Sequence, residues 1–206
     1  MMLSTESYGR RSERMAEIST LVRSVRRSRK LTQRELAGRS GVAQSRVALV
    51  ERQQESPGIE TATRLLAGAG HRLYAAPTTR DDVATIAADI RTAVQRDDSL
   101  LAFRYFIQMN DNLVAEQGLL RGVLAVTEPE STGSKTWDSA IAALVAYRLN
   151  AQHVPLPSWV NTPARRLERA RVLNVDPADP VPTRDDVPEE FLEHGVLIWR
   201  DSLEGV

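Results

Sequence analysis

The sequence predicts a mainly α-helical protein: a five-helix N-terminal domain, then a helical C-terminal domain with proline-rich loops and one short strand pair. Apolar residues recur three and four positions apart along much of the first 150 residues, which is the period of a helix with one buried face. Seven of the ten prolines lie between Pro155 and Pro188, and helix interiors do not accept proline. With 206 residues and 42% hydrophobic content, the chain is long enough for two small domains.

The distribution of charge separates the two halves of the chain. Residues 1–76 contain 14 Lys and Arg against 7 Asp and Glu, whereas residues 77–206 contain 13 against 20, so the halves carry about +7 and −7. A basic module can neutralise phosphates, and an acidic one is repelled by them. We therefore expect a flexible basic arm at 1–16, a nucleic-acid-binding domain at 17–76 and a partner-binding or oligomerisation domain at 77–206.

The composition also bears on the compartment. The chain has no cysteine, which suits a reducing cytoplasm and excludes disulfides and thiolate metal sites. Its longest apolar runs, such as residues 140–147, are far shorter than the roughly 20 residues of a membrane helix. We expect a cytoplasmic protein that makes no membrane contact.

The first expected helix has one apolar stripe, formed by Ile18, Leu21, Val22 and Val25. Positive charge gathers at its C-terminal end, in Arg26, Arg27, Arg29 and Lys30. Such a cluster complements the helix dipole, and it can equally contact phosphate, so both interpretations stay open.

A pair of short helices follows. Thr32 and Glu35 form a T-x-x-E capping box, which predicts that a helix begins there. Gly41 stands where a tight turn needs positive φ, and Val47 and Val50 give the next helix one apolar side. After the break at residues 57–58, helical spacing returns in Ala62, Leu65, Leu66 and Ala69.

Residues 17–70 resemble the Cro/CI (Xre-like) helix-turn-helix regulators, a lambda-repressor-like fold. The resemblance rests on Gln33, Leu36, Ala37, Gly41, Gln44, Val47, Glu51 and Arg52. It implies a sequence-specific DNA-binding protein whose second helix of the pair lies in the major groove. The tail after this module resembles that of bacterial antitoxins and implies a short strand at residues 72–75.

The resemblance implies two sets of DNA contacts. The base-reading candidates are Gln44, Ser45, Arg46 and Leu49. A glutamine amide can pair with adenine N6 and N7, and an arginine fork can pair with guanine O6 and N7. Leu49 departs from the family, where this position is usually polar; it either touches a thymine methyl or packs. The phosphate candidates are Thr32, Gln33, Arg52 and Gln53, and for each candidate the alternative is a solvated polar residue.

The C-terminal half predicts further helices. Apolar stripes mark them at residues 83–90, 100–107, 113–126 and 137–148, the third interrupted by Gly118 and Gly122. Short helices are expected at residues 164–171 and 188–194, and a strand at residues 196–199.

Enzyme signals are weak, and we expect no catalytic site, metal or cofactor. His71, His153 and His194 are isolated, so no H-E-x-x-H zinc motif is present. Ser134 beside Lys135 is better explained by coincidence than as the nucleophile and base of a self-cleaving repressor. The three tryptophans, Trp137, Trp159 and Trp199, either fill the core of the second domain or line a partner surface.

The stretch from Thr132 to Trp199 resembles the C-terminal region of actinobacterial helix-turn-helix antitoxins. The matching segments are residues 137–138, 157–159, 165–166 and 191–198. The resemblance implies an autoregulating antitoxin in which residues 77–206 bind a toxin, conceivably a nucleotidyltransferase, while the first domain represses the shared promoter as a homodimer. The alternative is a stand-alone or phage-type regulator whose second half dimerises or senses a ligand.

Overall fold

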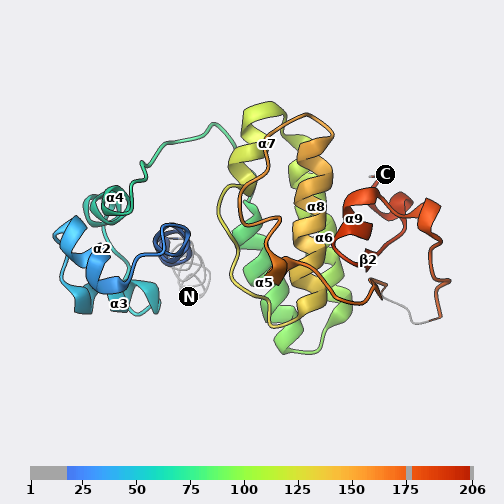
Figure 1. Cartoon of the computed structure of the whole chain (residues 1–206), viewed down its shortest axis with the longest axis horizontal. Helices are drawn as coiled ribbons and strands as arrows, with labels where there is room; N and C mark the ends of the chain where they lie inside the picture. Colours follow the sequence, from blue (N-terminus) through green and yellow to red (C-terminus); the bar gives the residue numbers. More distant parts are fainter. Residues whose placement is uncertain (1–17, 175–177, 205–206) are drawn as a thin grey trace, which may run out of the picture. The chain divides into compact units, whose positions relative to one another are not determined.

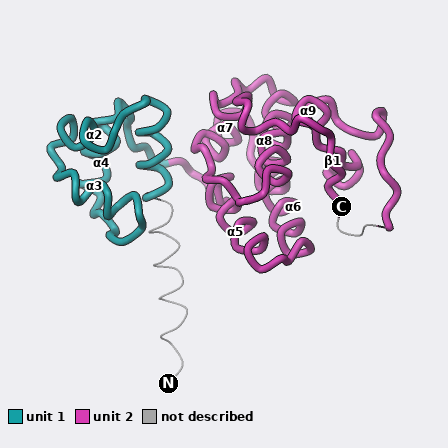
Figure 2. The backbone as a smooth tube through the Cα atoms, turned by 60° about the horizontal axis from the view of Figure 1, so that its bottom comes forward, with its two compact units in different colours: residues 1–75 teal, residues 76–206 magenta. Residues whose placement is uncertain are grey.

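The computed structural model describes residues 18–174 and 178–204 and divides the chain into two compact units (Figures 1 and 2). Unit 1 comprises residues 1–75, drawn in teal in Figure 2, and unit 2 comprises residues 76–206, drawn in magenta. The expected basic arm at 1–16 lies outside the described residues. The mainly helical fold expected from the sequence is confirmed.

Unit 1 is a small helical bundle. Its elements are the helical residues 18–28, α2 (Gln33–Ser40), α3 (Gln44–Glu51) and α4 (Ile59–Gly68). The described part of this unit therefore holds four helices, and the expectation of five within 17–76 is wrong in this respect. The core is formed by the apolar positions whose spacing predicted the helices: Val22, Val25, Leu31, Leu36, Val42, Val47, Val50, Leu65, Leu66 and Ala69.

The strand expected at residues 72–75 is absent from the described structure of unit 1. Residues 71–76 are neither helix nor strand, and the side chains of Leu73 and Tyr74 are 45% and 81% exposed. A strand needs a neighbouring strand to satisfy its backbone groups, and no described strand lies within this unit. The segment instead leads directly into unit 2.

Unit 2 is built around one buried helix. The helices α5 (Val83–Gln95), α6 (Ser99–Ala115) and α7 (Gly118–Ala125) pack on α8 (Lys135–Asn150), and the C-terminal segments α9 and β2 also contact α8 (Figure 1). Eleven of the sixteen residues of α8 are buried, because its alanine-rich sequence is apolar nearly all round. The whole unit therefore shares one core.

The third expected helix of this half was misplaced. The sequence suggested one interrupted helix over residues 113–126, whereas α6 continues to Ala115 and α7 begins at Gly118. The chain breaks at Glu116, whose backbone is extended, and Gly118 has a φ of 53°. Gly118 therefore marks the start of a new helix, and Gly122 lies within it.

The C-terminal third is mostly irregular. Its elements are η1 (Pro163–Arg165), β1 (Arg171–Val172), η2 (Arg184–Asp186), α9 (Glu189–Glu193), β2 (Val196–Leu197) and η3 (Arg200–Leu203). The helix expected at residues 164–171 is only the single 3-10 turn η1, because the chain becomes extended from residue 166 toward β1. The expected strand pair exists as β1 and β2, which run parallel with Arg171 opposite Val196.

The tryptophans differ in burial. Trp137 and Trp159 are 8% and 4% exposed and belong to the core of unit 2, whereas Trp199 is half-buried. No helix among the described residues has both the length and the apolar character needed to cross a membrane.

Candidate nucleic-acid interface

The α2–turn–α3 segment is held by local contacts that its sequence dictates. The Thr32 hydroxyl accepts a hydrogen bond from the Glu35 amide at 3.2 Å, and the Glu35 carboxylate accepts one from the Thr32 amide at 2.7 Å. The same backbone hydrogen bond lowers the pKa of Glu35 below its ordinary value. At the other end of α2, Gly41 has a φ of 65°, in the left-handed region that favours glycine. The capping box and the turn expected from the sequence are both present.

Arg64, on α4, fastens the turn from outside. Its Nη2 donates to the Gly41 carbonyl at 2.6 Å, and its Nε donates to the Ser40 carbonyl at 3.2 Å. These carbonyls end α2 and would otherwise lack partners. The guanidinium therefore fixes the angle at which α3 leaves the turn. Sequence analysis missed this role, because the acceptors are backbone atoms and leave no mark in the side-chain pattern.

One face of α3 is presented to solvent. Val47 and Val50 are fully buried, while Gln44, Ser45 and Arg46 are exposed at the beginning of the helix and Leu49 is 39% exposed. The structure thus brings the four base-reading candidates together on one short helix whose opposite side is held in the core. Ala43, the N-cap of α3, provides no side-chain hydrogen bond, so the first amides of α3 keep their donors for another acceptor.

Arg46 has an internal partner. Its Nε lies 2.6 Å from Oε1 of Glu55, with side-chain exposures of 47% and 30%. An exposed ion pair of this kind contributes only about 0–1 kcal/mol, because water and salt screen it. The pair holds the guanidinium near the exposed face and can be exchanged for a stronger acceptor.

The phosphate candidates are placed less uniformly. The Thr32 hydroxyl is engaged with Glu35, and the Gln33 side chain donates through Nε2 to Glu51 at 2.8 Å. Arg52 and Gln53 lie exposed just after α3. Contacts of the first two residues with phosphate would therefore use backbone amides at the start of α2, where an anion is favoured.

Glu51 is the buried polar centre of unit 1. Its side chain is 3% exposed, and Arg26 binds both carboxylate oxygens, at 2.6 and 2.9 Å. Burial alone would raise the pKa of Glu51, but the hydrogen bonds from Arg26 and Gln33 outweigh it and hold that pKa below its ordinary value. The carboxylate therefore joins the first helix, α2 and α3.

This arrangement resolves an open question about the basic cluster at residues 26–30. Arg26 is turned inward, since its Nη1 also donates to the Leu31 carbonyl at 2.7 Å. Arg27, Arg29 and Lys30 are exposed, so these three remain available for phosphate. No signal in the sequence distinguished Arg26 from its neighbours, because its partner lies 25 residues away.

A family model described as "Helix-turn-helix" matches residues 22–69. Residues 22–69 form a helix-turn-helix domain. The match covers the core and the exposed face of α3 in this domain, and it supports a DNA-binding transcriptional regulator of Xre/Cro-like type. Residues 76–206 lie outside the matched range. No curated protein and no solved structure matched the chain.

Among the described residues, no group of three or more His, Asp or Glu side chains is arranged to hold a metal ion. Chemical function in the helix-turn-helix domain therefore rests on exposed amide, hydroxyl and guanidinium groups, which are the groups that bind base edges and phosphates.

Proposed function

We propose that this chain is a sequence-specific transcriptional repressor that reads its operator with the exposed face of α3. The observation that carries the proposal is the joint exposure of Gln44, Ser45 and Arg46 on a helix that lies within the matched domain. In proteins with this motif, the residues at the start of the second helix contact base edges in the major groove. Gln44 supplies the donor and acceptor that fit adenine, and Arg46 supplies the fork that fits guanine.

The remaining basic groups would fix the position of the domain on the duplex. Arg52 lies exposed after α3, and Arg27, Arg29 and Lys30 lie exposed after the first helix. Contacts of this kind with phosphates carry no base specificity but supply much of the affinity and make it depend on salt.

Gel-shift titration of the purified full chain tests the base-reading role. The probes are the duplex upstream of its own gene and a scrambled duplex. Gln44→Ala should weaken binding to the upstream duplex by about 5- to 100-fold, which corresponds to the 1–3 kcal/mol of one bidentate base contact. Binding to scrambled DNA should change little. Arg104→Ala, which removes an exposed positive charge from α6 in unit 2, is the control.

Equal loss on both duplexes, with a shallower dependence on salt, would assign Gln44 to phosphate contact and would contradict the base-reading proposal. Arg52→Ala should show this second pattern, because it is proposed to contact phosphate. The two variants thus provide opposite expectations within one domain.

For unit 2, we propose that it binds a toxin protein and that the chain is the autoregulating antitoxin of the pair. The resemblance of residues 132–199 to antitoxin C-terminal regions supports this proposal. The excess of acidic residues in 77–206 suits a basic partner. A row of apolar side chains is also exposed on α7 and just after it: Leu119 at 81%, Val123 at 38% and Val126 at 62%. Exposed apolar patches mark partner-binding surfaces.

Co-expression with the neighbouring reading frame tests this role. The two proteins should co-purify, and Leu119→Asp should weaken the complex without unfolding unit 2, since Leu119 is largely exposed. Lack of a co-purifying neighbour would favour a stand-alone or phage-type regulator. Light scattering of the free chain checks the proposed homodimer, which would suit a palindromic operator.

A further inference from the structure

A basic pocket lies in unit 2, away from every element that the DNA-binding proposal uses. Its volume is about 560 Å³, within the range of small-molecule sites. The lining residues that carry or accept charge are Lys135, Asn161, Arg166, Glu168, Arg169 and Arg171. Pro163 and Leu167 add apolar wall. All of these residues come from the start of α8 and from the segment between residues 161 and 171.

The positive charge of this pocket is not neutralised within the described structure. Arg166 donates to the amide oxygen of Asn161 at 3.2 Å, and no ion pair joins Lys135, Arg166, Arg169 or Arg171 to a described carboxylate. Other arginines of unit 2 are paired, as Arg91 is with Glu130 at 2.8 Å. Four cations that repel one another therefore gather in a part of the chain whose net charge is about −7.

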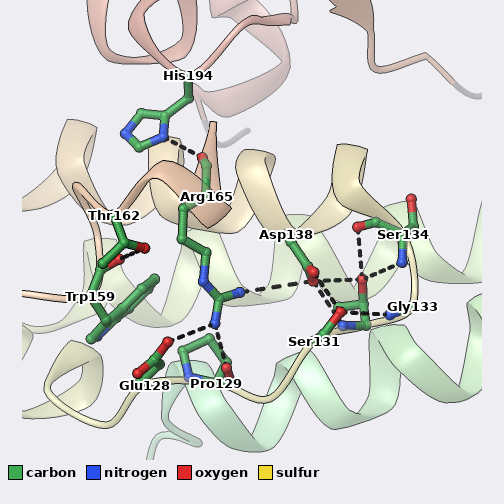
Figure 3. A network of polar contacts seen from close by, with 11 residues as sticks. Glu128, Pro129, Ser131, Gly133, Ser134, Asp138, Trp159, Thr162, Arg165 and His194 are labelled. Carbon is green, nitrogen blue, oxygen red and sulfur yellow. Dashed lines mark hydrogen bonds and ion pairs between the residues drawn. The ribbon is translucent and has the colours of Figure 1, made fainter. Parts of the chain in front are cut away.

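The walls of the pocket are fixed from behind by a buried polar network (Figure 3). Asp138 on α8 accepts hydrogen bonds from the amide and the hydroxyl of Thr132, both at 2.8 Å, which holds the loop that leads to Lys135. Arg165, beside Arg166 in the sequence, is 5% exposed and donates to the Pro129 carbonyl. Its guanidinium also lies 5.3 Å from the centre of the Trp159 ring.

His194 completes this support. The ring is fully buried, and its Nδ1 lies 2.7 Å from the Arg165 carbonyl, to which it donates. The network thereby ties the β2 side of the unit to the turn that carries Arg166. The cationic groups are mounted on a fixed frame, so binding an anion there costs little reorganisation.

We propose that this pocket binds a phosphorylated small molecule carrying at least two negative charges, of the size of a nucleoside diphosphate. Guanidinium forks match phosphate oxygens in two-point contacts, and Lys135 adds a compact charge. Lys135 is also the first residue of α8, whose N-cap Ser134 makes no side-chain capping bond, so the helix start adds to the positive potential. Pro163 and Leu167 offer an apolar surface to the organic part.

The acidic residue of the pocket sharpens the test. Glu168 lines the same space and repels phosphate, so its replacement should strengthen binding, whereas replacement of an arginine should weaken it. Opposite effects of neighbouring exposed residues cannot arise from a general loss of folding.

The experiment is calorimetric titration of the full chain with sodium pyrophosphate and with ADP at constant ionic strength. One pyrophosphate should bind per chain. Arg166→Ala and Arg169→Ala should each weaken binding at least tenfold, and Glu168→Gln should strengthen it. Arg104→Ala, an exposed arginine on α6, should have no effect. Circular dichroism of each variant confirms that it is folded.

Absence of binding by the wild-type chain, or equal loss in Arg104→Ala, would overturn the proposal. Citrate that binds as tightly as pyrophosphate would overturn the phosphate assignment. Loss of operator affinity in Arg166→Ala without any binding of pyrophosphate would assign the surface to the DNA backbone instead. The titration contains no DNA, so Gln44→Ala should bind pyrophosphate normally whether or not α3 reads bases.

Discussion

The buried carboxylate of Glu51 shows how much one residue can decide in a small domain. It accepts three side-chain hydrogen bonds, two from Arg26 and one from Gln33, and none of these partners is its neighbour in the sequence. A buried charge that loses its partner is costly, because neither water nor another donor replaces it. The position of α3 therefore depends on Arg26, which touches no DNA in our account.

Arg26→Ala should destabilise unit 1 by about 3–5 kcal/mol, since it leaves Glu51 charged and only partly satisfied. Urea unfolding followed by circular dichroism measures the loss. The double variant Arg26→Met/Glu51→Leu should recover much of it, because the pair is then replaced by apolar groups. A single variant as stable as the wild type would show that the ion pair contributes nothing.

His194 makes the stability of unit 2 depend on pH. Burial lowers its pKa below the ordinary value, although the hydrogen bond with the Arg165 carbonyl opposes this shift. The folded state thus holds the neutral ring, while the unfolded chain takes up a proton near pH 6.5. The stabilising contribution is complete above that pH and is lost as the pH falls from about 6.5 toward the lowered pKa of the folded state.

His194→Asn should reduce this acid sensitivity, because the asparagine amide can still donate to the Arg165 carbonyl but does not titrate. Thermal melts between pH 7.5 and pH 5 compare the variant with the wild type. His153→Asn, at an exposed position, is the control and should melt with the pH dependence of the wild type. An unchanged pH dependence in His194→Asn would contradict the assignment.

At the scale of elements, two helical glycines of unit 1 offer a matched comparison. Gly68 in α4 lies against α2, where an added Cβ would come within 3.0 Å of Ser40 backbone and side-chain atoms. Gly38 in α2 has open space around the same position. Close approach of α2 and α4 therefore requires glycine at one site and not at the other.

Gly38→Ala should stabilise unit 1 by up to about 1 kcal/mol, the difference in helix propensity between the two residues. Gly68→Ala should destabilise it by about 1–3 kcal/mol, because the added methyl pushes the helices apart. Chemical denaturation distinguishes the two. Stabilisation by both variants would show that the α2–α4 contact is looser than the structure indicates.

Most helices could be predicted from the sequence, because each buries a stripe whose spacing is local. The capping box at Thr32 and the turn at Gly41 were equally visible. The errors occurred where distant contacts decide the outcome. The segment at residues 72–75 has strand-like composition but no neighbour to pair with, and the Arg-rich segment at 164–171 is drawn out toward β1, which pairs with β2.

The candidate site shows the same division. The exposed face of α3 followed from the alternation of Val47 and Val50 with polar residues. The inward orientation of Arg26, the engagement of Gln33 and the clamp by Arg64 did not, because each partner lies 18 to 25 residues away. The basic pocket of unit 2 was also missed, since Lys135 is separated from the arginines of residues 166–171 by most of α8 and a loop.

At the scale of the whole molecule, the charge divides the work. A net charge of zero conceals a basic unit 1 and an acidic unit 2. Attraction to DNA is thereby confined to the helix-turn-helix domain, since unit 2 as a whole is repelled by phosphates. The cationic pocket of unit 2 is a local exception, which is why we assign it a small ligand rather than a duplex.

The central claim is that the exposed face of α3 reads base edges. Selection of bound sequences from a random duplex pool tests it most directly. The wild-type chain should enrich one sequence motif, and Gln44→Ala should lose the base preference at one position while retaining the rest. Enrichment of no motif by the wild type, or of an identical motif by both proteins, would contradict the claim.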